Sequence, residues 1–157
     1  MNIDAQPSVP KSMKIVPEVS APDEVLNAIY QADVVILGPG SFLTSVIPPL
    51  LVLDIKHAII RSPAVKILIA NMVPEDGPTG KMQLSQKMHW MESVVGANIV
   101  DAIVWPHSRA LNGAGSLNVI VADLFCREHE RVHDRDKLAK VIREVVTHLR
   151  ELKQKTA

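Results

Sequence analysis

The stretch Ala32-Asp-Val-Val-Ile-Leu-Gly-Pro-Gly-Ser-Phe-Leu-Thr-Ser45 decides the fold. Four consecutive apolar residues, Val34 to Leu37, lead directly into Gly38-Pro39-Gly40-Ser41, and Phe42 to Ile47 can begin a helix. A strand that ends in a glycine turn and opens a helix directs unpaired backbone N–H groups at one point. That point is electropositive and suits a phosphate or another anion. The stretch therefore predicts a site for an anionic small molecule, and we expect a nucleotide.

Composition limits the class of protein. The chain has 157 residues, of which 47% are hydrophobic and 3% aromatic, so we expect residues 1–157 to form a single α/β region with an aliphatic core. Seventeen basic residues balance seventeen acidic ones, and aromatic side chains for base stacking are few. We therefore expect neither a nucleic-acid partner nor binding to an anionic membrane.

The sequence contains few features that indicate a cellular compartment, and these features agree with one another. The start, Met1 to Pro7, lacks the basic and apolar segments of a signal peptide, and the apolar run Val46 to Leu53 is interrupted by two prolines. Cys126 is the only cysteine of the sequence, so no intrachain disulfide is possible. We expect a cytoplasmic protein with no membrane-spanning segment.

Apolar runs alternate with amphipathic segments along the chain. We expect strands at 13–16, 33–37, 65–70, 101–105 and 117–122, and helices from Ser20, from Phe42, and at 50–60, 83–95 and 137–152. Ser20 and Asp23 match a capping box, Pro48-Pro49 stops or redirects the helix that begins at Phe42, and Gly96 suits a C-cap. The pattern predicts a three-layer, Rossmann-like α/β fold, a mostly parallel sheet with helices on both faces.

Two strand ends are expected to meet. Strands 33–37 and 65–70 are joined through helix, so they should run parallel, with Gly38–Ser41 and Asn71 side by side at the edge where open α/β sheets bind ligands. The hydroxyls of Ser41, Thr44 and Ser45 can share one face of the following turn. The alternative is a tight turn with helix caps and no ligand. The turn is neither a dinucleotide fingerprint nor a P-loop, and no catalytic residue is assigned.

The segment His129-Glu-Arg-Val-His133 has the letters of the zinc-peptidase motif H-E-x-x-H. Its neighbours are charged, whereas a metal-binding helix normally packs into an apolar core. No third ligand follows at a recognisable spacing. We therefore assign no metal ligand, and interpret the segment as a charged connection into the last helix, with Asp134 or Asp136 as its N-cap.

Residues 32–52 resemble the gluconeogenesis factor family of bacteria, which is related to the 2-phospho-L-lactate transferase (CofD) of coenzyme F420 biosynthesis. Later patches agree in order: the strand ending in Asn71, Ile99–Val104, and His133-Asp134 followed by Lys137-Leu-Ala139. The glycine-rich N-terminal half of that family has no counterpart here, so the chain resembles the C-terminal half only, a partial domain. Pro49 replaces a usual Asn, and residues 72–80 lack the usual Gly-Glu-Thr.

The resemblance implies a regulatory protein that binds a nucleotide-sugar of the UDP-N-acetylglucosamine type, linked to carbon metabolism and cell-wall morphogenesis. It implies that the phosphates are surrounded by Gly38, Pro39, Gly40, Ser41, Thr44 and Ser45, and that the same cleft is bordered by Asn71, His133 and Asp134.

Two other function classes stay open. The first is a transferase-like phosphotransferase that needs Mg²⁺. This chain offers Asp33, Asp54, Asp76 and Asp134 but no paired set at a strand end, so the metal-binding acids would lie in the half that it lacks. The second is a ligand-free interaction module. The apolar stripe of helix 137–152 is either core or dimer interface, and we expect a homodimer.

Overall fold

The computed structural model describes residues 6–156. Within them, four parallel strands form one sheet in the order β1-β2-β3-β4. Their bounds are β1 Val34–Leu37, β2 Val65–Ile69, β3 Ala102–Pro106 and β4 Val119–Ala122. The expected strands 33–37, 65–70, 101–105 and 117–122 are confirmed to within two residues. β1, β3 and β4 are continuous apolar runs, and β2 is apolar except for Lys66, as expected for parallel strands that are covered by helices.

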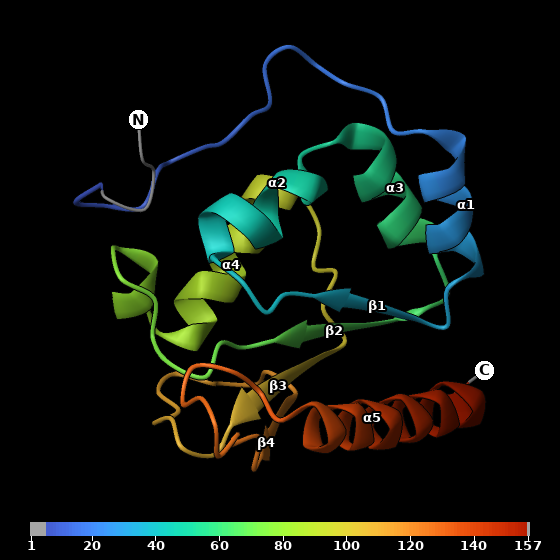
Figure 1. Ribbon diagram of the computed structural model, residues 1–157. Helices are drawn as coiled ribbons and strands as arrows, with labels where there is room; N and C mark the ends of the chain where they lie inside the picture. Colours follow the sequence, from blue (N-terminus) through green and yellow to red (C-terminus); the bar gives the residue numbers. More distant parts are fainter. Residues whose placement is uncertain (1–5, 157) are drawn as a thin grey trace.

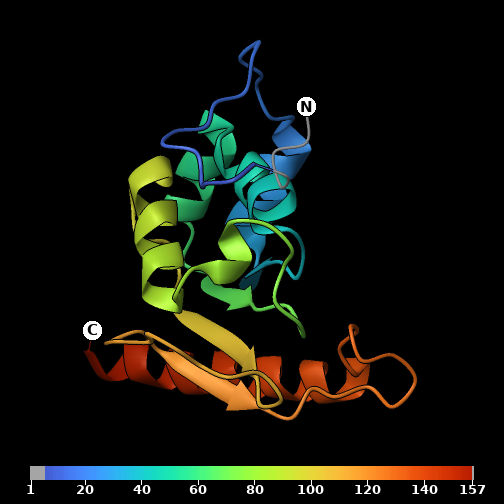
Figure 2. The same cartoon turned by 90° about the vertical axis from the view of Figure 1, so that its left-hand side faces the viewer.

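Helices lie on both faces of the sheet, which confirms the three-layer α/β architecture. Figure 1 shows α1 to α4 on one side of the strands and α5 on the other, where it contacts β2 and β3, and Figure 2 shows α5 beneath the layer of the other helices. The bounds are α1 Asp23–Gln31, α2 Ile47–Leu50, α3 Leu53–Arg61, α4 Leu84–Val95 and α5 Arg135–Thr156. Short π and 3₁₀ turns cover Phe42–Val46 and Thr79–Lys81.

The sheet separates two apolar clusters. The larger cluster packs α2 and α4 against one face and includes Leu43, Ile47 and Leu68. The smaller one packs α5 against the other face through Val145 and Leu149. The pleat explains the division, because successive side chains of a strand point to opposite faces. The helix predicted at 137–152 therefore buries its apolar stripe as core in this chain.

The segment before α1 corrects two predictions. Residues 13–16 form no strand; Met13 packs against the larger cluster, and the Trp90 indole N–H donates to the Pro10 carbonyl at 2.8 Å. Ser20 does not cap α1, whose N-cap is Pro22 with no side-chain cap. The reason is a tertiary contact, since the neighbouring Ala21 N–H donates to an Asp54 carboxylate oxygen of α3 at 3.2 Å.

The helical segment that begins at Phe42 ends with α2 at Leu50, directly after Pro48 and Pro49, and the chain bends by 79° before α3. The prediction that Pro48-Pro49 stops or redirects this helix is therefore confirmed. The turn before α2 is π-helical, with the Val46 N–H donating to the Ser41 carbonyl at 3.0 Å. Gly96 is confirmed as the C-cap of α4, with a left-handed φ of 85°.

No single helix within residues 6–156 has the length and apolar character that crossing a bilayer requires. Phe42–Leu50 and Leu53–Arg61 meet those criteria only when taken together across a bend of 79°.

Candidate functional site

One side chain joins the turn after β1 to the end of β2. The Gly40 N–H donates to Asn71 Oδ1 at 2.9 Å, and Asn71 Nδ2 donates to the Gly40 carbonyl at 3.1 Å. The expected proximity of Gly38–Ser41 and Asn71 is therefore confirmed. Gly38 has a left-handed φ of 78°, and a Cβ there would lie 3.0 Å from the Ile69 carbonyl oxygen. Glycine is required at Gly38 both by its backbone conformation and by the close approach of β2.

Glu75 is a residue of this edge that the sequence did not point to. Its Oε2 accepts the Phe42 N–H at 2.9 Å and the Thr79 hydroxyl at 3.1 Å, and its Oε1 lies 3.3 Å from Lys87 Nζ. Lys87 Nζ also lies 5.1 Å from the centroid of the Phe42 ring. Burial lowers the pKa of Lys87, and the charge of Glu75 partly opposes that shift. Glu75 therefore links the 72–78 loop to the start of the helical turn and to α4.

Arg109 adds a second partly buried cation behind the strand ends. Its guanidinium lies 4.2 Å from the centroid of the Trp105 ring and donates to the Asn71 carbonyl at 3.1 Å. Burial lowers the pKa of Arg109, and the charge of Glu75 acts in the opposite direction. This contact fixes the main chain of Asn71 from the side of β3.

The H-E-x-x-H segment is not helical and connects β4 to α5, as predicted. His133 is buried, and its Nε2 lies 2.9 Å from the Ala70 carbonyl oxygen. Asp134 Oδ1 accepts the N–H groups of Asp136 and Lys137 at 3.1 and 3.0 Å, so Asp134 is confirmed as the N-cap of α5. His129 is exposed. The two histidines therefore do not share a helical face.

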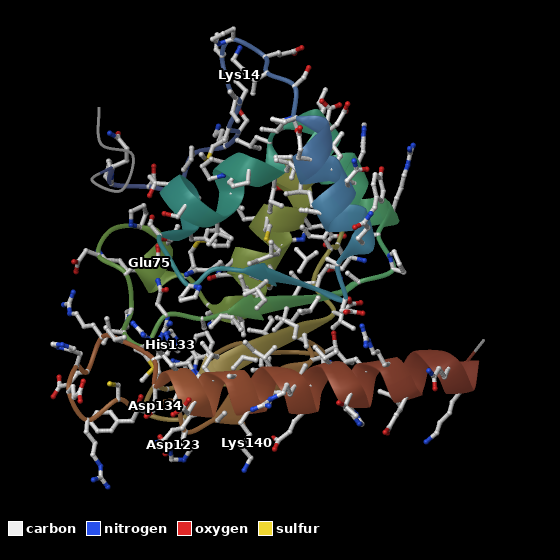
Figure 3. The ribbon with its side chains drawn as sticks, turned by 45° about the vertical axis from the view of Figure 1, so that its right-hand side comes forward. Lys14, Glu75, Asp123, His133, Asp134 and Lys140 are labelled. Atoms are coloured by element: carbon white, nitrogen blue, oxygen red, sulfur yellow. The ribbon has the colours of Figure 1, made fainter. Side chains whose placement is uncertain are left out.

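These elements surround an open hollow of about 560 Å³ at the carboxyl edge of the sheet. It is lined by Pro39, Gly40, Ser41, Asn71, Val73, Pro74, Glu75, Asp76, Arg131, Val132 and His133. Figure 3 shows Glu75 and His133 at this edge, on opposite sides of the sheet. Its charged lining consists of two carboxylates and one guanidinium, besides the imidazole, so the hollow is polar but not strongly positive.

Some of the predicted site residues line the hollow and the others do not. Five of the predicted residues, Pro39, Gly40, Ser41, Asn71 and His133, line the hollow. Gly38 lies beneath them in the turn, and Asp134 is engaged as a helix cap. Thr44 and Ser45 are exposed and are not part of the lining.

The backbone N–H groups of the turn differ from the expectation in one respect. The N–H groups of Gly40 and Phe42 were expected to be unpaired, but they donate to Asn71 and Glu75. The reason is general, because main-chain donors away from water are nearly always paired in folded proteins. An anion can take these two donors only by exchange with a side chain.

Comparison with known proteins supplies the family. Residues 1–148 match the family described as "2-phospho-L-lactate transferase CofD". A protein of Pasteurella multocida named "Putative gluconeogenesis factor" is 37% identical over 150 residues, which cover 95% of this chain and 49% of the relative. A protein of the same name from Vibrio cholerae is 39% identical over 135 residues, or 85% and 45% of the two chains.

The structural comparison agrees. The crystal structure of a UPF0052 family protein from Bacillus halodurans superposes with a TM-score of 0.73 at 26% identity, covering 82% of this chain and 48% of that one. The chain thus spans about half the length of the curated relatives it matches. On the match over residues 1–148, the chain belongs to the CofD family, together with relatives that are named as gluconeogenesis factors.

Proposed function

We propose that this chain binds the diphosphate of a nucleotide-sugar, of the UDP-N-acetylglucosamine type, in the hollow between the Gly38–Ser41 turn and the 131–133 segment. The role would be regulatory, in the cytoplasm, linked to carbon metabolism and cell-wall morphogenesis. The observation that carries the proposal is the hollow at the carboxyl ends of β1 and β2, where the Gly40–Asn71 bonds hold a glycine turn beside a second strand end.

The position and the chemistry both support a phosphate ligand. Open parallel sheets bind ligands outside the carboxyl ends of their strands, and glycine lets a ligand approach the main chain closely. Arg131 lines the hollow and is exposed, so its guanidinium can reach a phosphate without losing an internal partner shown in the structure. A hydrogen bond to a charged oxygen contributes about 1.5–3 kcal/mol. The relatives' name supports the link to carbon metabolism.

Binding of an anion would involve Glu75. A phosphate oxygen that accepts the Phe42 N–H must replace Glu75 Oε2, which has the same sign of charge and occupies the same donor. Displacing Glu75 also frees Lys87, whose ammonium would then neutralise the incoming anion. Nucleotide binding would therefore be coupled to a rearrangement of the 72–78 loop.

The second candidate function is a phosphotransferase, because the matched family is described as a transferase and because Glu75 and Asp76 line the hollow. Mg²⁺ would be needed to neutralise the phosphoryl oxygens. The described residues do not fit that ion: no group of three or more His, Cys, Asp or Glu side chains is placed to hold a metal. Both Glu75 oxygens also have donors already.

Calorimetric titration with UDP-N-acetylglucosamine tests the proposal, with N-acetylglucosamine as the ligand that lacks the diphosphate. Arg131→Gln should weaken binding roughly 10- to 100-fold, the equivalent of one charged hydrogen bond. Arg127→Gln is the matched control, because Arg127 lies in the same exposed segment but does not line the hollow. Absence of binding both in this chain and in the complete Vibrio cholerae relative would overturn the proposal. Turnover of a nucleoside phospho-donor with Mg²⁺ would favour the transferase.

A further inference from the structure

Within residues 6–156, strand β1 lies at a free edge of the sheet but has the composition of an interior strand. Val34 packs on the α5 face and Val35 on the α2 and α4 face, so the strand is apolar on both sides. Ile36 lies on the same face as Val34 and is 45% exposed. Natural edge strands are usually protected by charged residues, proline or a bulge, and Val34–Leu37 contains neither charge nor proline.

A groove beside β1 leaves room for another element. Its volume is about 440 Å³, and it is lined by Glu24, Val25, Ala28, Ile29, Ala32, Val34 and Val35. Apart from Glu24, every lining residue is apolar, and Val25 of α1 is 38% exposed. Helix α1 packs against α3 in the same layer, so a strand added next to β1 would be covered by α1 on this face.

The order in which the chain visits the strands indicates what kind of element would fit beside β1. From β1 the chain passes through α2 and α3 to β2 and through α4 to β3, always in one direction across the sheet (Figure 1). Right-handed crossovers in one direction place their helices on one face, as seen here for α2 to α4. A doubly wound sheet contains two such halves that wind away from a central strand pair, and its ligand lies where the direction reverses.

We propose that the free edge of β1 pairs with a parallel strand from a second polypeptide segment, the counterpart of the half of the relatives that this chain does not match. The relatives contain about as much chain again as they share with this protein. Pairing there would make β1 a central strand and would make its Gly38–Ser41 turn the reversal point. The added strand would end beside the hollow and contribute residues to it.

A second copy of this chain fits the edge less well. Two β1 strands related by a two-fold axis run antiparallel, so the amino end of one would lie beside the Gly38–Ser41 turn of the other. No second strand end would then reach the hollow. Pairing of two β1 edges is accordingly one of the outcomes that the experiment must separate from the proposal.

Co-expression provides the first test. This chain is produced together with a tagged polypeptide that comprises the unmatched part of the Pasteurella multocida relative. We expect the two to co-purify as a one-to-one complex. Ile36→Lys should abolish co-purification, whereas Val121→Lys should leave it unchanged. Val121 is the matched control, because it is a β-branched residue that is 47% exposed on the opposite edge strand β4.

A chimera provides the second test, in which this chain replaces the matched part of the same relative. Ile36→Lys should lower the Tm roughly 5–10 °C more in the chimera than in this chain alone, since only the chimera buries that edge. Val121→Lys should shift both proteins equally. Equal shifts for Ile36→Lys, or a homodimer of this chain that dissociates with Ile36→Lys, would overturn the proposal. The proposal would also be overturned if the chimera failed to fold and the two separate polypeptides failed to co-purify. Each result is independent of nucleotide binding.

Discussion

The two loops that face each other across the hollow are held in opposite ways. The Gly38–Ser41 turn is fixed from three sides, by the oxygen and nitrogen of the Asn71 side-chain amide, by Glu75 at Phe42, and by the close approach of Ile69 to Gly38. The facing 127–133 segment is exposed and charged, and of its residues only His133 is buried. The fixed loop therefore supplies precise geometry, and the exposed loop supplies side chains that can adjust to a ligand.

Removal of the Asn71 amide should produce the largest loss on the fixed side. Asn71→Ala leaves the Gly40 N–H and carbonyl without their partners, and each orphaned group costs about 1–3 kcal/mol. We expect the free energy of unfolding to fall by about 2–4 kcal/mol in urea denaturation. Asn71→Asp keeps the acceptor for Gly40 N–H and should lose less. Equal losses for the two variants would show that the Gly40–Asn71 pair does not hold the turn.

Gly38→Ala tests the backbone of the same turn. Alanine in a left-handed conformation costs about 1–2 kcal/mol, and the Cβ would also crowd the Ile69 carbonyl oxygen at 3.0 Å, so we expect a total of about 2–3 kcal/mol. Gly96→Ala is the matched control, because Gly96 has a φ of 85° with nothing within 4 Å of the added Cβ. Its cost in thermal or urea denaturation should be the smaller. A reversed order would contradict the close approach of β2.

In the exposed 127–133 segment, we expect substitution of only one of the two histidines to lower the free energy of unfolding. His133→Ala removes a buried ring and its hydrogen bond to the Ala70 carbonyl, and we expect a loss of about 1–3 kcal/mol. His129→Ala, in the same motif but exposed, should stay within about 0.5 kcal/mol of the wild type. Comparable losses for both histidines would show that the whole segment is packed, in contrast to its exposure in the structure.

The sequence predicted the parts of this comparison that depend on local pattern. The apolar runs located the strands, and parallel winding then placed Asn71 beside the glycine turn. Glu75 could not be found in this way, because it lies in a loop without periodicity and its partner Phe42 is 33 residues away. The path of residues 13–16 was missed for a related reason. A short apolar run bounded by prolines does not reveal whether strands or helices will cover it.

His133 illustrates an intermediate case. The resemblance to the gluconeogenesis factors placed it at the cleft, but neither its burial nor its bond to Ala70 follows from the charged residues around it. The letters of the zinc motif were uninformative, because spacing places two side chains together only when the segment is helical. The residues between β4 and α5 are not helical.

Lys87 gives the smallest expected effect and tests how the fixed loop is supported from behind. Its pKa is lowered from 10.5 in the folded protein, chiefly by burial, so the unfolded chain binds more protons between the lowered value and 10.5. Stability contributed by this group must therefore rise with pH across that window, and the cost of burying its charge is fully present at neutral pH. Lys87→Met removes the titration. The difference in Tm between wild type and Lys87→Met should consequently move in favour of the wild type as the pH is raised from neutral toward 10.5.

Glu75→Gln removes the opposing charge and should extend the rise to lower pH, because the Lys87 pKa then falls further. A difference that is flat with pH would mean that Lys87 is solvated, and a difference that falls would mean that the charge of Glu75 outweighs burial in setting the Lys87 pKa.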